Sequence, residues 1–180
     1  MDTLLPWAIG AAETLVKVLL AIAVVGFVAF AWRLVRHPPM RAVDGTARDL
    51  ALASALAIVV VLTLLTPSVE GEAPQVRVIP FIDLFEALDG RRSLRFAVAE
   101  LIGNVVLFIP LGMALRWRFP SLEVLQIGAL ALAASVAVEL TQGLTGAGRW
   151  SDSTDVIMNT IGGVIGAGLA LLGMAQVREP

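Results

Sequence analysis

A stretch near the C-terminal end of the chain, residues 151–173, reads SDSTDVIMNTIGGVIGAGLALLG and indicates the fold most directly. Its apolar part, from Val156 to Leu172, is long enough for a helix that crosses a bilayer core, which needs about 17–25 residues. The helical period places polar and small residues on one face: Asp155, Asn159, Gly162, Gly166, Ala170 and Gly173. Because glycines four residues apart let two helix backbones approach closely in lipid, we expect this face to point into a helix bundle.

Four further apolar segments of similar length precede this one. They run approximately from Trp7 to Trp32, Leu50 to Thr66, Phe96 to Trp117 and Leu122 to Leu140. A segment inside lipid must satisfy its own backbone hydrogen bonds, so each is expected to be a helix. The sequence therefore predicts an all-α integral membrane protein, a bundle of about five transmembrane helices that forms a single membrane domain over residues 1–180.

The composition of the chain supports this fold class and excludes others. Of 180 residues, 58% are hydrophobic and only 16% are charged, and the mean hydropathy is +0.86. An ordinary globular domain has about 45–50% apolar and about 25% charged residues, so a soluble protein is excluded. A net charge of −2 provides no electrostatic footprint for nucleic acid. With no cysteine and only one histidine, His37, we expect no metal site and no cofactor.

The distribution of basic residues predicts how the bundle lies in the membrane. Four arginines fall in the connection between the first two predicted helices: Arg33, Arg36, Arg41 and Arg48. By the positive-inside rule this side is cytoplasmic, which places the N-terminus outside and the C-terminus in the cytoplasm. The basic residues follow the first apolar segment instead of preceding it, so that segment is expected to be a retained helix and not a signal peptide.

The longest predicted outer connection, Pro67 to Arg95, contains a short amphipathic pattern. Apolar residues recur at helical spacing from Phe81 to Leu88, and Pro80 is suited to the start of a helix. The pattern predicts a short helix that either lies in the outer membrane interface or caps the bundle.

Polar residues inside or beside apolar helices are the candidate functional residues. Each ionisable group at the centre of a membrane costs about 2.5–3.5 kcal/mol or more unless it faces protein or water. Eight such residues are predicted to lie in the outer half of the bundle: Glu100, Asn104, Glu139, Gln142, Arg149, Asp152, Asp155 and Asn159. One interpretation is an outward-facing polar cavity, in which Arg149 binds a phosphate or carboxylate and the acids hold a cation, hydroxyl or amide group. The alternative is that Arg149 only neutralises the nearby acids and orients the helices.

These residues occur in motifs that resemble the VanZ-like family. The motifs run from Asn104 to Gly112 with Pro110 inside, from Glu139 to Gln142, and from Arg149 to Gly163. Ile79-Pro80-Phe81 is similar to a further family element, and the resemblance covers roughly residues 50–172. One departure is that many members have an acid where this chain has Thr154. We expect five residues in and beside these motifs to have structural roles: Pro110, Gly112, Gly162, Gly163 and Gly166.

The resemblance implies a multi-pass plasma-membrane protein of a bacterium that acts at the outer surface. The family's name member is associated with resistance to teicoplanin, a lipoglycopeptide that targets cell-wall precursors outside the membrane. Our first hypothesis is non-enzymatic: besides the lipid bilayer, the cavity contacts the headgroup of a lipid-linked wall precursor or the lipid-anchored drug.

Two alternatives stay open. The first is an enzyme that acts on a lipid-linked phosphate or sugar, with Glu139 or Asp155 as general base and a divalent cation as its only conceivable cofactor. The second is a structural partner of an envelope complex that uses the glycine-rich last helix. The lack of an outer histidine and of an established catalytic motif favours a protein that is not an enzyme. The oligomeric state is left open by the sequence.

Overall fold

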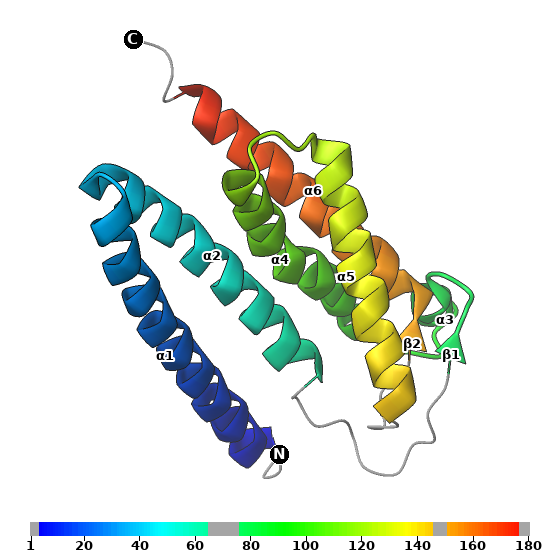
Figure 1. The fold of residues 1–180 in the computed structure, drawn as a ribbon. Helices are drawn as coiled ribbons and strands as arrows, with labels where there is room; N and C mark the ends of the chain where they lie inside the picture. The colour runs from blue at the N-terminus through cyan, green and yellow to red at the C-terminus, as the bar shows by residue number, and fades with distance from the viewer. Residues whose placement is uncertain (1–3, 65–75, 146–150, 177–180) are drawn as a thin grey trace.

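The computed structural model describes residues 4–64, 76–145 and 151–176, and it is almost entirely helical. The elements follow in the order α1 (Leu4–Arg36), α2 (Pro39–Leu64), β1 (Val76–Arg77), α3 (Ile82–Leu88), α4 (Leu94–Arg118), α5 (Val124–Thr145), β2 (Ser151–Asp152) and α6 (Ser153–Gln176) (Figure 1). In this part of the chain α2, α4, α5 and α6 are long and apolar enough to cross a membrane. The all-α prediction is confirmed, and the helices are those of an integral membrane bundle. A fifth span in α1 and the inside–outside orientation stay predictions.

The largest difference from the predicted helices concerns the connection from Arg33 to Arg48. It is helical except at His37 and Pro38, so that α1 and α2 form a tight antiparallel hairpin. Proline fits the first position of a helix because its missing N–H would be unpaired there, and Pro39 takes this position in α2. The polar start of α2 was not detected because its residues do not belong to an apolar run.

Helix α6 packs against α4 through glycines. A Cβ atom on Gly162 or Gly166 would lie under 3.0 Å from the backbone of α4, at Val105 and Ile109 respectively. The same holds for Gly112 of α4 against the backbone of Gly163. The prediction that this face of the last helix points into the bundle is therefore confirmed at Gly162 and Gly166, where the two backbones touch. It is wrong at Gly173, which is exposed at the far end of the face and has nothing within 4 Å. Helix α4 continues through Pro110 without ending there.

The core of the bundle lies where α2, α4, α5 and α6 meet. Its fully buried members include Phe108 and Leu111 of α4, Ile127 and Ala131 of α5, and Ala167 of α6. Small residues allow close contact between these helices: Phe108 of α4 lies against Gly162 of α6, and Gly128 of α5 lies against Val164 of α6. This packing sets the positions of the ends of α4, α5 and α6 relative to one another.

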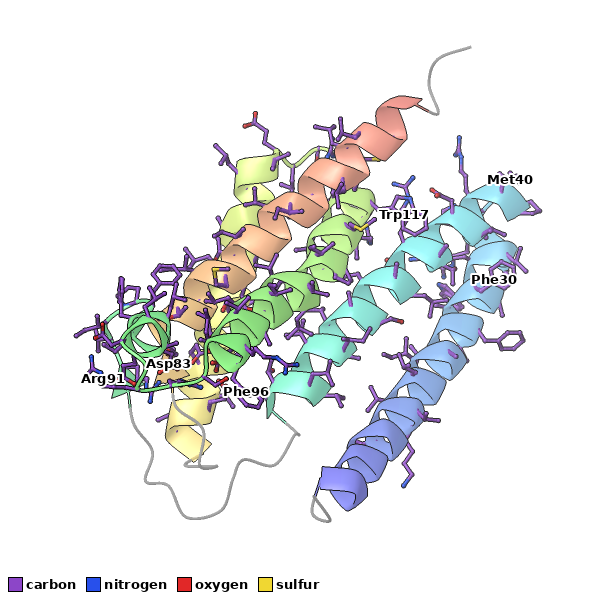
Figure 2. All side chains as sticks on the ribbon, turned by 180° about the vertical axis from the view of Figure 1, so that it is seen from behind. Phe30, Met40, Asp83, Arg91, Phe96 and Trp117 are labelled. Carbon is purple, nitrogen blue, oxygen red and sulfur yellow. The ribbon has the colours of Figure 1, made fainter. Side chains whose placement is uncertain are left out.

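The two ends of the bundle differ in character. One, here called the arginine end, carries Asp49 of α2 between Arg33 of α1 and Arg118 of α4, with nitrogen–oxygen distances of 2.5 and 2.6 Å. The opposite end, here called the polar end, carries β1, β2 and α3. Figure 2 shows the separation, with Trp117 and Met40 toward the first end and Asp83, Arg91 and Phe96 at the second.

The polar end is assembled by a short sheet. Strand β1 pairs in parallel with β2, Val76 opposite Ser151 and Arg77 opposite Asp152. Since β2 leads directly into α6, this pairing ties the segment before α3 to the start of α6. Helix α3 confirms the predicted short helix, and its two faces differ: Ala87 is buried, whereas Phe85 and Leu88 are 55% and 65% exposed. One face of α3 packs against α4, and Phe85 and Leu88 form an exposed apolar edge. The location of this helix in the outer membrane interface stays a prediction.

Candidate functional site

Most of the predicted site residues converge at the polar end. Asn104 and Glu100 lie in the first half of α4, Glu139 in the last part of α5, and Asp155 and Asn159 in the first turns of α6. Because α4 and α6 run from this end and α5 runs toward it, positions far apart in the sequence reach the same depth (Figure 1). The site is therefore a product of helix direction together with the glycine packing of α4 on α6.

Asp155 is held by a direct contact between α6 and α4. The side-chain amide of Asn104 donates a short hydrogen bond to a carboxylate oxygen of Asp155. A carboxylate near the start of a helix is also favoured by the positive end of the helix dipole. The partner is a neutral amide, so this contact adds no positive charge beside the acid.

Glu139 holds the start of α6 from the side of α5. One of its carboxylate oxygens accepts a hydrogen bond of 2.8 Å from the backbone N–H of Asp152, and the glutamate side chain is buried. Asp152 in turn accepts a bond of 2.6 Å from the backbone N–H of Thr154. The two carboxylates thereby satisfy backbone donors at the start of α6, which would otherwise be unpaired.

Asn159 and Gln142 lie deeper and link helices. Asn159 donates a 2.9 Å hydrogen bond to the hydroxyl of Ser135 on α5, and both residues are buried. The amide oxygen of Asn159 has no hydrogen-bond partner among the described residues. Gln142 donates a 2.8 Å bond to the backbone carbonyl of Thr63, which joins α5 to α2. Gln142 is therefore part of the contact between α5 and α2, and it is not among the residues that line the cavity described next.

The acids at the polar end surround a very small cavity. Its volume is about 10 Å³, and its lining is Phe81, Asp83, Leu84, Ala97, Glu100, Leu101, Asp152, Thr154 and Asp155. This space suffices for about one water molecule. A cavity of this size admits only one small group. The predicted outward-facing cavity that includes Arg149 stays a prediction. Within the described ranges, no cluster of three or more acidic, histidine or cysteine side chains has the geometry to hold a metal ion.

The sequence of residues 17–174 matches the sequence model of the VanZ/LLP1 family. The chain belongs to this family. It is also similar to Protein VanZ of Enterococcus faecium, with 40% identity over 77 residues, which are 43% of this chain and 46% of that protein. The similarity thus covers about half the length of that relative. No solved structure matches the chain.

The VanZ/LLP1 motifs meet at the polar end, where Thr154 bridges two of them. Its hydroxyl accepts a 2.8 Å hydrogen bond from the backbone N–H of Phe81, in the segment before α3. Phe81 has a positive φ of 61°, a conformation rare for a bulky residue that costs of order 1–3 kcal/mol. The threonine found where many members have an acid therefore helps to hold a strained turn beside the acidic cavity. A carboxylate oxygen could accept the same bond.

The ion pairs that our sequence reasoning missed belong to the loop and α3 of this VanZ/LLP1 domain. Asp83 pairs with both Arg77 and Arg92, and Arg92 also lies 3.2 Å from Glu100. Desolvation by burial lowers the pKa of Arg92, but the neighbouring Asp83 and Glu100 outweigh it and raise the pKa above its usual value. The available signal was Asp83 itself, an acid in a short helix flanked on both sides by arginines.

Arg149 of the VanZ/LLP1 motif lies outside the described residues, so its predicted contacts stay predictions. The arginines described at the polar cavity are instead Arg77 and Arg92, which pair with acids.

Proposed function

We propose that this chain recognises a hydrogen-bond donor group, an ammonium or a hydroxyl, on the headgroup of a lipid-linked cell-wall precursor or of a lipid-anchored lipoglycopeptide. Recognition at the outer face of the bacterial plasma membrane then reduces contact between teicoplanin-type drugs and their target. The observation that carries the proposal is the convergence of four carboxylates, from α3, α4 and the start of α6, on a cavity of about 10 Å³.

The chemistry of the cavity favours a donor as the bound group. Asp152 and Asp155 are held by neutral N–H donors, namely the backbone of Thr154 and the amide of Asn104. Neither of these two contacts brings a positive charge to the acids, and the oxygen atoms of a carboxylate accept hydrogen bonds. A bond between an ammonium and a carboxylate is also stronger than one between neutral groups.

The size of the cavity limits recognition to one group of a larger molecule. Room for about one water admits a single ammonium or hydroxyl, while the rest of the headgroup lies over the polar end. The exposed side chains of Phe85 and Leu88 on α3 provide apolar contact beside it, which suits a molecule anchored in the membrane interface.

The test compares drug susceptibility in a sensitive bacterium that carries wild type, Asp155→Asn, Glu139→Gln or an empty vector. We expect wild type to raise the inhibitory concentration of teicoplanin, and more than that of vancomycin, because only teicoplanin carries a lipid tail. Both variants are expected to fall toward the empty vector at equal membrane levels. Asp89→Asn is the matched control, since Asp89 is an exposed acid at the same end that pairs with Arg91. If the two variants protect as well as wild type, the proposal is wrong.

Mass spectrometry of lipid extracts from the same strains separates binding from catalysis. Recognition alone leaves the masses of lipid-linked precursors unchanged in all strains. A precursor of shifted mass that appears with wild type and disappears with Asp155→Asn would replace the proposal with an enzyme that acts on lipid-linked phosphate or sugar. The alternative of a structural partner relied on the glycine face of the last helix, and this face packs against α4 within the chain.

A further inference from the structure

An apolar groove lies between α2, α4 and α6 toward the arginine end, apart from the acidic cavity. Its volume is about 720 Å³, and its walls include Ala51 and Ser54 of α2, Pro110 and Ala114 of α4, and Ala170 of α6. The groove opens onto the surface of the bundle and is not an interior void. Small side chains on all three helices create it.

The groove continues toward the arginine end, where Arg48 in the first half of α2 and Trp117 in the last turn of α4 line it. Arg48 donates a hydrogen bond of 3.0 Å to a carboxylate oxygen of Asp44 and one of 3.2 Å to the backbone carbonyl of Trp117. Its Nη2 atom lies 2.9 Å from the other carboxylate oxygen of Asp44. A guanidinium has five N–H donors, and these contacts use three. Two donors of Arg48 remain for a further acceptor at the mouth of the groove.

Charge at the arginine end is complementary to an anion. The described residues of this end include six arginines and three acids: Arg33, Arg36, Arg41, Arg48, Arg116 and Arg118, with Asp44, Asp49 and Glu123. Asp49 and Asp44 are already paired with arginines. An excess of positive charge beside an apolar groove between membrane helices is the arrangement that binds acidic phospholipids.

The volume of the groove decides between a lipid chain and another helix. Three turns of helix, about 16 Å long and about 10 Å wide, occupy roughly 1,300 Å³. A groove of about 720 Å³ is too small for such a helix to enter, but it is large enough for an extended hydrocarbon chain. In a bilayer, an apolar groove open to the hydrocarbon region does not stay empty, because its walls would lose their contacts on one side.

We propose that this groove is a binding site for one acidic phospholipid, with an acyl chain between α2, α4 and α6 and the phosphate at Arg48. The site is separate from the polar end, so the proposal stands independently of headgroup or drug recognition there. In this proposal the small side chains of α2 and Pro110 of α4 have a binding role and no catalytic role. They form the walls for the chain.

Native mass spectrometry of the full chain, purified in a mild detergent, tests the site with two added lipids of identical acyl chains, phosphatidylglycerol and phosphatidylcholine. We expect one bound phosphatidylglycerol per chain, preferred over phosphatidylcholine by about fivefold, the effect of about one arginine near an acidic headgroup. Arg48→Gln is expected to abolish the preference. Arg91→Gln, at the exposed Arg91 of the polar end, is the charge-matched control and is expected to keep it.

A second pair of variants tests the groove itself. Ala170→Phe places a large side chain into the groove and is expected to reduce the bound fraction of both lipids severalfold. Ala133→Phe adds the same bulk at an exposed position of α5 and is expected to have no effect. Equal binding of the two lipids by wild type, or an unchanged preference in Arg48→Gln, would overturn the proposal. So would a dimer that forms in place of the lipid complex and is broken by Ala170→Phe.

Discussion

The contact between α4 and α6 can be tested at Gly162. In the structure a Cβ atom on this residue would lie under 3.0 Å from the backbone oxygen of Val105. Backbone atoms in a packed helix cannot move aside as the end of a flexible side chain can. Gly162→Ala must therefore push α6 away from α4. Asp155, which accepts the hydrogen bond from Asn104, lies about two turns before Gly162 on α6.

The magnitude follows from two opposing effects. Overpacking by one methyl group in a tight contact costs about 1–3 kcal/mol, whereas replacing glycine with alanine inside a helix gains about 0.5–1 kcal/mol. The net loss is about 1–2 kcal/mol, which lowers Tm by about 2–8 °C in a protein of this size. Gly168→Ala is the matched control on the same helix, because a Cβ there has nothing within 4 Å.

The assay is thermal unfolding in detergent, followed by the fraction of protein that still elutes as a single species in gel filtration. We expect Gly162→Ala to melt below wild type and Gly168→Ala to melt at or slightly above it, since only the helix gain applies there. Equal Tm values for the two alanine variants would refute the close approach of α4 and α6. A higher Tm for Gly162→Ala than for Gly168→Ala would refute it as well.

Two further predictions concern buried and half-buried polar contacts. Ser135→Ala removes the acceptor of the Asn159 amide N–H and leaves a second buried polar group of Asn159 unpaired, so we expect a loss of about 1–3 kcal/mol in the free energy of unfolding. Thr160→Ala removes a hydroxyl that bonds within its own helix, and we expect it to cost less. If thermal unfolding showed the reverse order, it would contradict this role of Ser135. Asp49→Asn weakens two ion pairs at a half-exposed site, and we expect it to lower the free energy of unfolding by about 1 kcal/mol and to speed protease cleavage near the α1–α2 turn. Asp44→Asn is the control and is expected to leave the cleavage rate unchanged. Equal cleavage rates for the two variants would show that Asp49 does not hold the hairpin.

Much of the fold was predictable because membrane helices carry a strong local signal. An apolar run of about 20 residues identifies a helix without any knowledge of its neighbours. The glycine spacing at Gly162 and Gly166 further indicated which face of the last helix packs. By contrast, the polar first turns of α2 were not predicted as helix, because charged residues such as Arg41, Asp44 and Arg48 are typical of a loop. The ion pair between Asp44 and Arg48 becomes apparent only in the structure.

The candidate site was predictable in its acids and less so in their partners. Glu100, Asn104, Glu139, Asp152 and Asp155 do meet at one end, as their depth in the helices predicted. Gln142 instead donates a hydrogen bond to the backbone of α2 and does not line the cavity. The ion pairs of Asp83 join a loop, a short helix and α4, and contacts of this kind depend on how the chain returns across the end of the bundle.

The sequence by itself determined the class of this protein, its apolar helices, its VanZ-like motifs and the depth at which its polar residues lie. These follow from local composition and helical period, which each segment carries alone. Only the tertiary structure decided that the acids enclose space for one small group, that Thr154 holds the turn at Phe81, and that small residues from three helices leave a groove beside Arg48. Such features depend on the gaps between side chains of different helices, and those gaps are set by packing across the whole bundle.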